Sequence, residues 1–393
     1  MTTTPLESPV ASLAPLEGIN SALMIHTDHL PRDYRYPASG LDVIRDLLDE
    51  DGVGVVYTVP GQQQRNPNAR ACVDQTRRRS PQATVLIDAD RYSGSSRKLA
   101  GQGIDESWTN LQLNAGLRWA MTDSGFVGDR DLAGAKAILE GAARQHEAAS
   151  RSGMGVIAAL PLAGSWLTDP QLLIGHIARV GVPVALMFEA EKDPLAVAGA
   201  VDGLVYLLNS GVPTLVLRTD TSGLGALSYG AAAVAIGDSS RRRHIYPQVD
   251  RDPNNWAPTP KPAALVPDLL GYFWLDRIRD AYQLNPELPV WRCDCRACAG
   301  RTIEWILNDQ QPDVAAFQHS VSALASLARR FFDPTKSEAD WQLSWHGRVV
   351  DAQMTYSEVG GNNQIWSPKP ELANWYSQYK RAGQSLTGGP SQP

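Results

Sequence analysis

Eight short apolar segments, each followed by turn residues and a helical pattern, predict an α/β fold: a (β/α)8 barrel, or TIM barrel. Nearly continuous apolar strands that alternate with helices indicate a parallel sheet buried on both faces. Eight such units match a barrel of this kind, which typically has about 250 residues. An open doubly wound sheet is the alternative fold, although no Gly-x-Gly-x-x-Gly follows an early strand. The predicted strands are 22–25, 53–59, 84–87, 118–121, 155–160, 182–188, 214–217 and 232–236.

Helical patterns separate these strands, and the rest of the chain divides around them. The composition, with 43% hydrophobic and 20% charged residues, is that of a globular protein, and no segment has the roughly 20 apolar residues of a membrane span. Residues 1–18 lack the basic region of a signal peptide, so we expect a disordered leader and a cytoplasmic protein. The expected helices are 41–49, 132–149, 170–180 and 195–209; the expected parts are a leader (1–18), a barrel (19–260), a metal subdomain (261–335) and an extension (336–393) whose tail, 384–393, is unstructured.

Three of the four cysteines lie within six residues, and a histidine follows them. Cys293, Cys295, Cys298 and His319 form a Cys3His set, the donor combination of a structural zinc ion with all four positions filled. The alternatives are free thiols, or a disulfide beside a core histidine; nothing marks this as a secreted chain. We expect a short helix at 302–308 and a second helix, 320–332, that His319 opens.

Acidic residues follow most of the predicted strands. In a (β/α)8 barrel the chemistry gathers at the carboxyl ends of the strands. A single acid there is usually the cap of the next helix, but so many on one rim indicate acid–base or nucleophilic carboxylate chemistry on a small polar substrate. No histidine pairs with these acids at the spacing of metal ligands. The acids are Asp28, Asp88, Asp90, Asp123, Glu189, Glu191, Asp220 and Asp238.

The segment after the eighth strand joins a carboxylate to a cationic loop. Asp238 is followed by Ser239-Ser240 and then by Arg241, Arg242 and Arg243. Guanidinium groups favour the anionic form of a neighbouring carboxylate, which keeps it available as a nucleophile. The same arginines are able to hold phosphates, whereas a structural Asp–Arg ion pair is the alternative. A second triplet, 77–79, either grips phosphate or forms a solvated turn.

A barrel with an aspartate after strand eight, an arginine loop and Cys-x-Cys-x-x-Cys…His resembles the tRNA-guanine transglycosylase superfamily. Members exchange guanine in a nucleic acid for a 7-deazaguanine base. The resemblance spans residues 22–332 and implies that Asp238 is the nucleophile, which attacks the ribose anomeric carbon. It implies a proton-transfer role for Asp88, with Asp90 its competitor, and a base-recognition role for Asp123. The string Thr122-Asp123-Ser124-Gly125-Phe126 is also similar to the family motif that carries the acid/base role, so Asp123 has two candidate roles.

The chain departs from the family pattern at several motifs. The second glycine and the glutamine of that motif are absent, 188–191 reads Phe-Glu-Ala-Glu, and the loop after strand eight differs. These departures put recognition of ordinary tRNA substrates in doubt and favour the DNA-acting branch (DpdA-type). The expected function is therefore exchange of guanine for a 7-deazaguanine, with 7-cyano-7-deazaguanine the expected base, in DNA. A tRNA enzyme and a catalytically silent barrel that binds nucleic acid or a partner are the alternatives.

The resemblance also implies what surrounds the reaction. Asp123, Ser124, Gly125, Arg241 and Arg243 are the candidate substrate-binding residues, and a structural Zn²⁺ is the expected cofactor. The expected partners are DNA before tRNA, the free base, and a second copy or the proteins of a DNA-modification system. Tyr92 and Phe126 either sandwich the flipped base or pack in the wall. The aromatic segment 373–382 is a nucleic-acid contact or a strap on the barrel.

Overall fold

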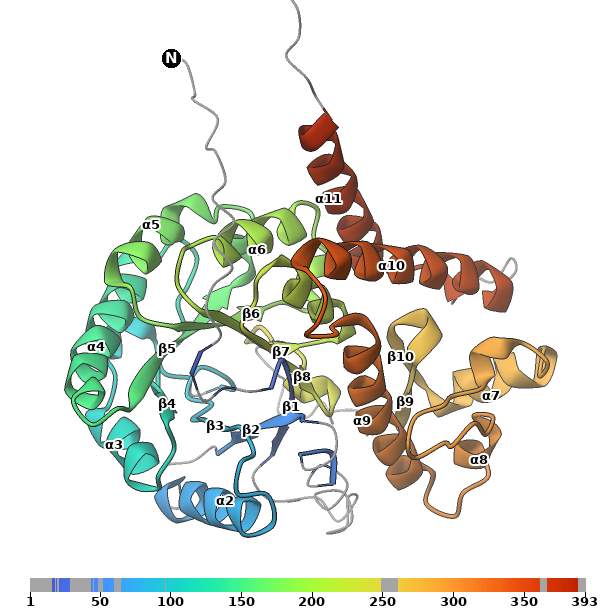
Figure 1. Cartoon of the computed structure of the whole chain (residues 1–393), viewed down its shortest axis with the longest axis horizontal. Helices are drawn as coiled ribbons and strands as arrows, with labels where there is room; N and C mark the ends of the chain where they lie inside the picture. Colours follow the sequence, from blue (N-terminus) through green and yellow to red (C-terminus); the bar gives the residue numbers. More distant parts are fainter. Residues whose placement is uncertain are drawn as a thin grey trace, which may run out of the picture.

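The eight predicted strands form one parallel sheet that curves into a nearly closed barrel (Figure 1). The computed structural model describes residues 16–17, 19, 21–28, 44, 46–48, 52–59, 65–95, 97–248, 261–360 and 366–387. The strand order is β3-β2-β1-β8-β7-β6-β5-β4, and no ladder joins β3 to β4 within these ranges. The (β/α)8 prediction is confirmed. The strands are β1 Leu23–Asp28, β2 Gly54–Thr58, β3 Val85–Asp88, β4 Trp119–Met121, β5 Gly155–Ala163, β6 Val184–Glu189, β7 Thr214–Thr219 and β8 Ala233–Gly237.

The strands have the burial that their apolar sequences predict. Every residue of β2, β5, β7 and β8 is buried, because the helices cover the outer face and side chains fill the barrel. Polar residues appear where the strands end, and β1 continues three residues beyond the predicted segment to include His26, Thr27 and Asp28. This extension matters because all three side chains lie at the rim.

Within the described ranges, five helices with defined bounds surround the barrel, and two of them were not predicted. They are α2 Arg65–Arg79, α3 Glu106–Asn114, α4 Leu132–Ser150, α5 Gln171–Val180 and α6 Ala200–Leu208. Asp105 and Asp131 cap α3 and α4 by accepting hydrogen bonds from backbone amides of the first turn. The predicted helix 195–209 is broken by Gly199, whose φ of 80° separates a short 3-10 turn from α6. Of the predicted helix 41–49, residues 44 and 46–48 are described, and they are helical.

A smaller unit follows the barrel and carries the cysteines (Figure 1). An antiparallel hairpin joins β9 Ala263–Val266 to β10 Gly271–Trp274, and α7 Leu275–Leu284, α8 Glu304–Leu307 and α9 Pro312–Phe331 follow. The prediction that His319 opens a helix is wrong. Pro312 starts α9 earlier, as proline favours the first helical turn, so His319 lies inside the helix, fully buried.

The last two helices pack on the barrel, which agrees with the interpretation of segment 373–382 as a strap. These are α10 Glu338–Gly360 and α11 Pro370–Thr387, which lie against the 3-10 segment η4 Thr221–Tyr229 after β7. Trp345 and Trp375 are buried there, and a Cβ on Gly225 would lie 2.5 Å from one indole and 2.7 Å from the other. The prediction of an unstructured tail from residue 384 is wrong as far as Thr387, where α11 ends; residues 388–393 lie outside the described residues.

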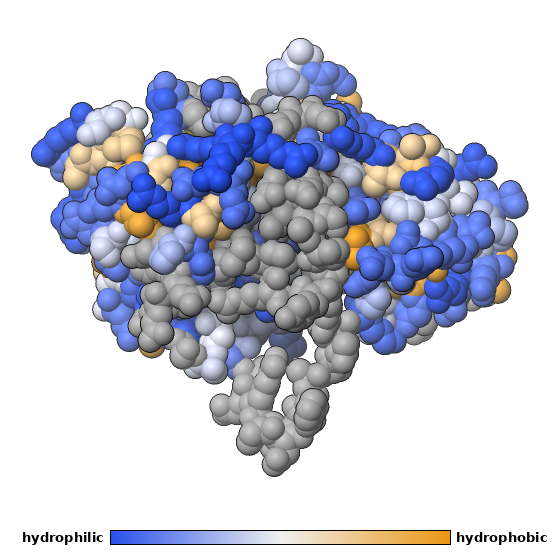
Figure 2. Space-filling view, turned by 90° about the horizontal axis from the view of Figure 1, so that it is seen from below, coloured by the Kyte–Doolittle hydropathy of each residue, from blue (hydrophilic) through white to orange (hydrophobic). Residues whose placement is uncertain are grey.

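The predicted leader is only partly described. Residues 1–15 lie outside the described residues, but Leu16 and Ile19 are buried, and the Glu17 carbonyl accepts a hydrogen bond from the Trp119 indole. Figure 2 shows a face on which hydrophilic residues predominate and apolar residues form small, separate patches. None of the described helices combines the length and apolar character that crossing a bilayer requires.

Candidate active site and metal centre

Two consecutive residues of β1 hold two of the predicted acids. The Thr27 hydroxyl donates to Asp238 Oδ2 at 2.6 Å, and His26 Nε2 lies 3.3 Å from Asp88 Oδ2. The Asp238 amide also donates to the His26 carbonyl at 3.0 Å, which continues the ladder between β1 and β8. The carboxyl ends of β1, β3 and β8 therefore bring the candidate nucleophile and the candidate proton carrier to one part of the rim.

Asp238 is partly exposed, and its environment differs from the one predicted. We expected the following arginines to favour its anionic form; the charge of Arg242 does lower the pKa of Asp238, although all three guanidinium groups form their ion pairs with other acids. Burial raises the pKa of Asp238 above its usual value, and the hydrogen bond from Thr27 partly offsets this rise. Within the described part of the chain, no cationic side chain forms an ion pair with Asp238. A neutral donor, the Thr27 hydroxyl, thus holds the carboxylate of this partly exposed residue.

Asp88 lies deeper, at the end of β3, and is 3% exposed. Its Oδ2 accepts from the Tyr92 hydroxyl at 2.5 Å and faces His26, while Oδ1 accepts from the Asp90 amide at 2.9 Å. The same His26 nitrogen is 2.9 Å from the Thr58 hydroxyl. Burial lowers the pKa of His26, although Asp88 opposes the shift, so the imidazole is neutral at pH 7. The pairing of His26 with Asp88 was not predicted from the sequence.

Asp90 is clamped between two buried arginines. Its Oδ1 accepts from Arg218 at 2.5 Å and its Oδ2 from Arg242 at 2.8 Å. Burial alone would raise the pKa of Asp90, but the charges of Arg218 and Arg242 outweigh it and hold that pKa well below its usual range. Asp90 and Arg218 also adopt left-handed backbone angles, with φ of 47° and 50°. A carboxylate held in this way stays ionised and is unsuited to carrying a proton.

The clamp predicts a large effect on stability. Replacing Arg242 with alanine leaves Asp90 with one cationic partner, Arg218, and removes a guanidinium that also binds Asp28, so the free energy of unfolding should fall by about 3 to 5 kcal/mol. Because the folded-state pKa of Asp90 is depressed, its contribution is present above the unfolded pKa of about 3.9 and is lost as pH falls below that value. Urea titrations at pH 7 and pH 3 measure both effects. An equal loss in Arg241→Ala, whose side chain is mostly exposed, would contradict the assignment.

The three arginines after β8 are bound within the protein rather than displayed together. Arg241 is exposed and bonds Asp28 at 2.5 Å, and Arg242 is buried against Asp28 and Asp90. Arg243 lies 3.8 Å from Asp220 and stacks over the Tyr272 ring at 3.2 Å. The alternative of structural Asp–Arg pairs therefore describes the geometry, and only Arg241 retains an exposed guanidinium for phosphate. The other triplet, 77–79, ends α2, where cationic side chains suit the helix dipole.

Asp123 and the two residues after it lie beneath the surface. Asp123 is 1% exposed, with its Oδ2 3.3 Å from the Lys98 ammonium and its Oδ1 accepting from the Asp105 amide at 2.6 Å. Ser124 is buried and shares a hydrogen bond with Thr122. A Cβ on Gly125 would meet the Leu99 carbonyl at 2.3 Å, so only glycine fits between these segments. Substrate contact by these residues stays a prediction.

The aromatic residues proposed to sandwich a base are part of the wall. Tyr92 is 1% exposed, and its hydroxyl bonds Asp88 and lies near Arg218 and Met187. Phe126 is buried under the Arg97 guanidinium, whose carbon lies 3.7 Å from the ring centroid. Arg97 in turn pairs with Glu189. Asp220 caps η4 through the Thr221 amide, as the helix-cap alternative holds for a single rim acid.

Sequence reasoning missed three residues that hold the rim together: His26, Thr27 and Arg218. The sequence could have indicated the first two, because His-Thr-Asp directly follows the apolar start of β1 and active-site residues of such barrels lie at the carboxyl ends of strands. For Arg218 the signal was a charge inside an otherwise apolar strand, Thr-Leu-Val-Leu-Arg-Thr. A charged residue inside a fully buried strand requires a partner, and here the partner is Asp90.

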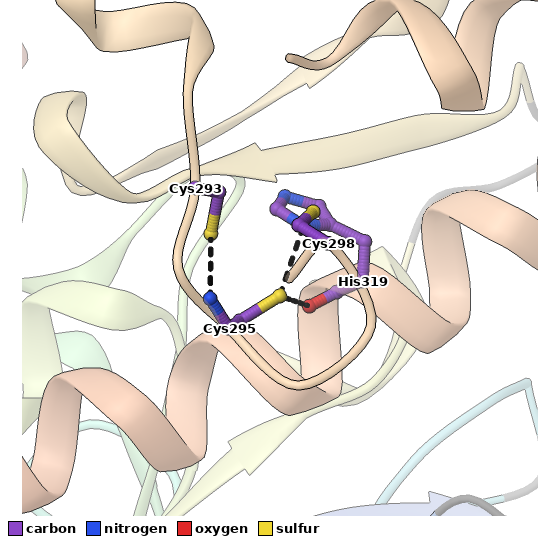
Figure 3. Close-up of side chains that lie close together, drawn as sticks. All are labelled: Cys293, Cys295, Cys298 and His319. Atoms are coloured by element: carbon purple, nitrogen blue, oxygen red, sulfur yellow. Dashed lines mark hydrogen bonds between the residues drawn. The ribbon is translucent and has the colours of Figure 1, made fainter. Parts of the chain in front are cut away.

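The Cys3His residues converge as predicted (Figure 3). Cys293, Cys295 and Cys298 lie on one loop and point toward His319 of α9, and all four donor atoms lie within 4.8 Å of one another. The His319 Nδ1 is 3.1 Å from the Cys298 sulfur and 3.6 Å from the Cys295 sulfur. The cysteines form no disulfide, so the disulfide alternative is wrong. The four residues are able to hold a metal ion.

The surroundings of the cluster also fit a metal. The Cys295 amide donates to the Cys293 sulfur at 3.4 Å, and the Trp305 indole donates to the Cys298 sulfur at 3.2 Å. The other ring nitrogen of His319 bonds the Leu265 carbonyl at 2.7 Å, which fixes the ring orientation. Hydrogen bonds of this type orient metal ligands and select the tautomer of the histidine. The donor set, three thiols and an imidazole, is the one that tetrahedral zinc prefers.

Comparisons with known proteins add little beyond the architecture. No family model and no curated protein matches the chain. Tryptophan synthase alpha chain from Legionella pneumophila matches with a TM-score of 0.38 at 12% identity, over 80% of this chain and 94% of that one. A mandelate racemase/muconate lactonizing protein from Paracoccus denitrificans has a TM-score of 0.34 at 14% identity, over 56% of this chain and about half, 55%, of that one. The carboxyl transferase domain of Rhizobium etli pyruvate carboxylase has a TM-score of 0.36 at 12% identity, over 93% and 60%. Values this low carry no argument about reaction or substrate.

Proposed function

We propose that this protein is a nucleic-acid guanine transglycosylase that exchanges guanine for a 7-deazaguanine base, such as 7-cyano-7-deazaguanine, in DNA. One observation carries the proposal. Asp238 directly follows β8, is partly exposed, accepts a hydrogen bond from the Thr27 hydroxyl and forms no ion pair within the described ranges. Two other rim acids, Asp28 and Asp90, are instead neutralised by arginines. A carboxylate that is positioned but unneutralised is suited to attack a cation-like sugar carbon.

The proposed reaction has two displacements at the same carbon. Asp238 attacks the anomeric carbon of the target nucleotide as the bond to guanine N9 breaks, and guanine leaves after gaining a proton. The result is an ester between Asp238 and the sugar. The 7-deazaguanine then loses the proton from N9, attacks the same carbon and displaces the carboxylate, which restores the enzyme. Splitting one displacement into two lowers the activation barrier of each step. The target base must first leave its stack to reach the mouth of the barrel.

Proton transfer is assigned to Asp88 rather than Asp90. Both Tyr92 and His26 share the Oδ2 of Asp88, and each is able to pass a proton. Asp90 is excluded because two arginines keep it ionised. Asp123 faces Lys98 and Arg91, and an anionic carboxylate suits acceptance of hydrogen bonds from the donors of a guanine edge. Asp123 is therefore assigned to base recognition.

The metal centre is assigned a structural zinc ion. Three cysteines and His319 fill a tetrahedron, which leaves no position for water or substrate, so the ion would supply no chemistry to the reaction. When bound, it would fix the loop of the cysteines against α9. The same unit supplies β9 and β10 beside the barrel, and we infer that it helps to position nucleic acid.

Base exchange is the experiment that tests the function. Duplex DNA and tRNA, each radiolabelled in guanine, are incubated with the protein and 7-cyano-7-deazaguanine, and the released label is counted. Release from DNA supports the proposal, whereas release from tRNA alone supports the tRNA enzyme. Release from neither, in the presence of the free base, contradicts both enzymes and favours the silent barrel that binds nucleic acid or a partner.

The pH profile of the exchange should report Asp238. The nucleophile must be ionised, and burial raises its pKa, so the rate should fall on the acid side at a higher pH than the value of about 3.9 for an ordinary aspartate. Thr27→Val removes a hydrogen bond that lowers this pKa, so the acid limb should move to still higher pH. Rates measured from pH 4 to 8 for both proteins check this. An acid limb that stays in place in Thr27→Val would contradict the assignment.

A further inference from the structure

Tyr272 of the hairpin lies between the metal centre and the candidate active site. Arg243, from the loop after β8, stacks over its ring at 3.2 Å. Burial raises the pKa of Tyr272 to about 12. The charge of Arg243 lowers this pKa and the acids Asp220 and Asp238 raise it, so these three charged groups lie near the hydroxyl. The hydroxyl is buried and has no hydrogen-bond partner among the described residues. A buried hydroxyl without a protein partner is normally satisfied by water or a ligand.

A continuous set of contacts joins Tyr272 to the metal ligands. His319 bonds the Leu265 carbonyl of β9 through the ring nitrogen that faces away from the cysteines. Leu265 is paired with Tyr272 across the β9–β10 ladder, and the Leu265 amide donates a hydrogen bond to the Ser320 hydroxyl of α9 at 3.0 Å. The position of the hairpin, and of Tyr272 with it, therefore depends on where His319 is held.

We propose that Tyr272 is a substrate-binding residue whose hydroxyl donates to an oxygen of the sugar-phosphate backbone at the target nucleotide, and that the metal centre positions it through His319 and Leu265. The inference rests on the proposed function for the identity of the ligand. The metal subdomain then contributes a substrate-binding residue to the site. The ion supplies no chemistry, but it fixes the hairpin whose strand β10 carries Tyr272. An oxygen acceptor fits because the hydroxyl is neutral at pH 7 and lies beside the cationic Arg243.

The substrate contact is tested by binding. Affinity for a fluorescent single-stranded DNA that contains one guanine is measured by anisotropy for wild type, Tyr272→Phe and Tyr282→Phe. Phenylalanine keeps the ring under Arg243, so the fold should be unchanged, and loss of one hydrogen bond should weaken binding about 10-fold. Tyr282, whose hydroxyl bonds Glu304 in the same subdomain, is the matched control and should stay within about 2-fold of wild type.

The positioning is tested without any substrate, by hydrogen–deuterium exchange before and after treatment with a chelator. Removal of the metal should increase exchange in 263–266 and 271–274 while 155–163 of the barrel is unchanged. Unchanged exchange in the hairpin, or an equal increase in the barrel strand, overturns the positioning. Wild-type binding that Tyr272→Phe does not weaken overturns the contact alone. If wild type binds no DNA, the proposed function and the contact both fall, and the exchange result still decides the positioning.

Discussion

Replacing Asp238 with asparagine should lower the rate of base exchange by about 10,000-fold or more, the scale seen when a catalytic nucleophile is removed. Asparagine keeps the size of the side chain and can still bond Thr27, but its amide cannot form the ester with the anomeric carbon. Binding of nucleic acid should change little, because the substitution leaves Arg241, the exposed candidate for holding phosphate, in place. Release of labelled guanine and an affinity measurement on the same preparation separate the two effects.

The matched control for this variant is Asp169→Asn. Asp169 lies between β5 and α5 and pairs at 3.3 Å with Arg130, whose side chain is exposed, and neither residue is among the predicted site residues. Its replacement should leave exchange within about 2-fold of wild type and stability within about 0.5 kcal/mol. A second check is trapping: denaturation during turnover should leave labelled DNA covalently attached to wild type and not to Asp238→Asn. Full activity in Asp238→Asn would remove the basis of the proposed mechanism.

Loss of the metal should have the largest effect on stability. Cys298→Ser removes a ligand whose sulfur lies 3.1 Å from His319 Nδ1, so we expect the purified variant to contain no zinc. Metal binding stabilises small zinc-dependent units by about 10 kcal/mol, and here the metal would join the cysteine loop to α9, whose apolar face is buried. Elemental analysis should therefore find one zinc per chain in wild type, and thermal unfolding of the variant should begin at a markedly lower temperature.

The fourth cysteine provides the control for that experiment. Cys72 is buried in α2 and is not part of the cluster, and a buried cysteine outside a disulfide behaves as a small apolar residue. Cys72→Ala should keep one zinc per chain and lose only about 1 to 2 kcal/mol of unfolding free energy. If Cys298→Ser retains its metal and melts as wild type does, the Cys3His assignment is wrong.

The strands could be predicted because their signal is local. A run such as Gly-Val-Ile-Ala-Ala-Leu needs no knowledge of its neighbours to be recognised as a buried strand, and β5 contains it. Helix α2 was missed because it is rich in arginine and its apolar stripe is short: the buried apolar residues are Ala69, Cys72 and Val73. The start of α9 was missed because the histidine and serine at 319–320 were taken for an N-terminus, whereas Pro312 is the better signal.

The partners of the rim residues could not be predicted, because they depend on how the strands close. His26 and Asp88 are 62 positions apart in the chain and meet only when β1, β2 and β3 align in register. The sequence likewise did not determine which carboxylate would form an ion pair with Arg242, because several carboxylates follow neighbouring strands. The acids themselves were found correctly at the strand ends; their electrostatic environment was not. The cysteine cluster could be predicted because three of its four ligands are close together in the sequence.

The packing of two indoles on Gly225 has a consequence for how the chain folds. The Trp375 indole donates to the Ser222 carbonyl at 2.9 Å, across 153 residues of sequence. During synthesis the barrel segment around η4 leaves the ribosome well before α11 exists, so an apolar surface stays uncovered until the later helices arrive. This interval is when aggregation competes with folding, and chaperone demand in the cell should concentrate there. Docking of α10 and α11 then completes a structure that already contains all eight strands.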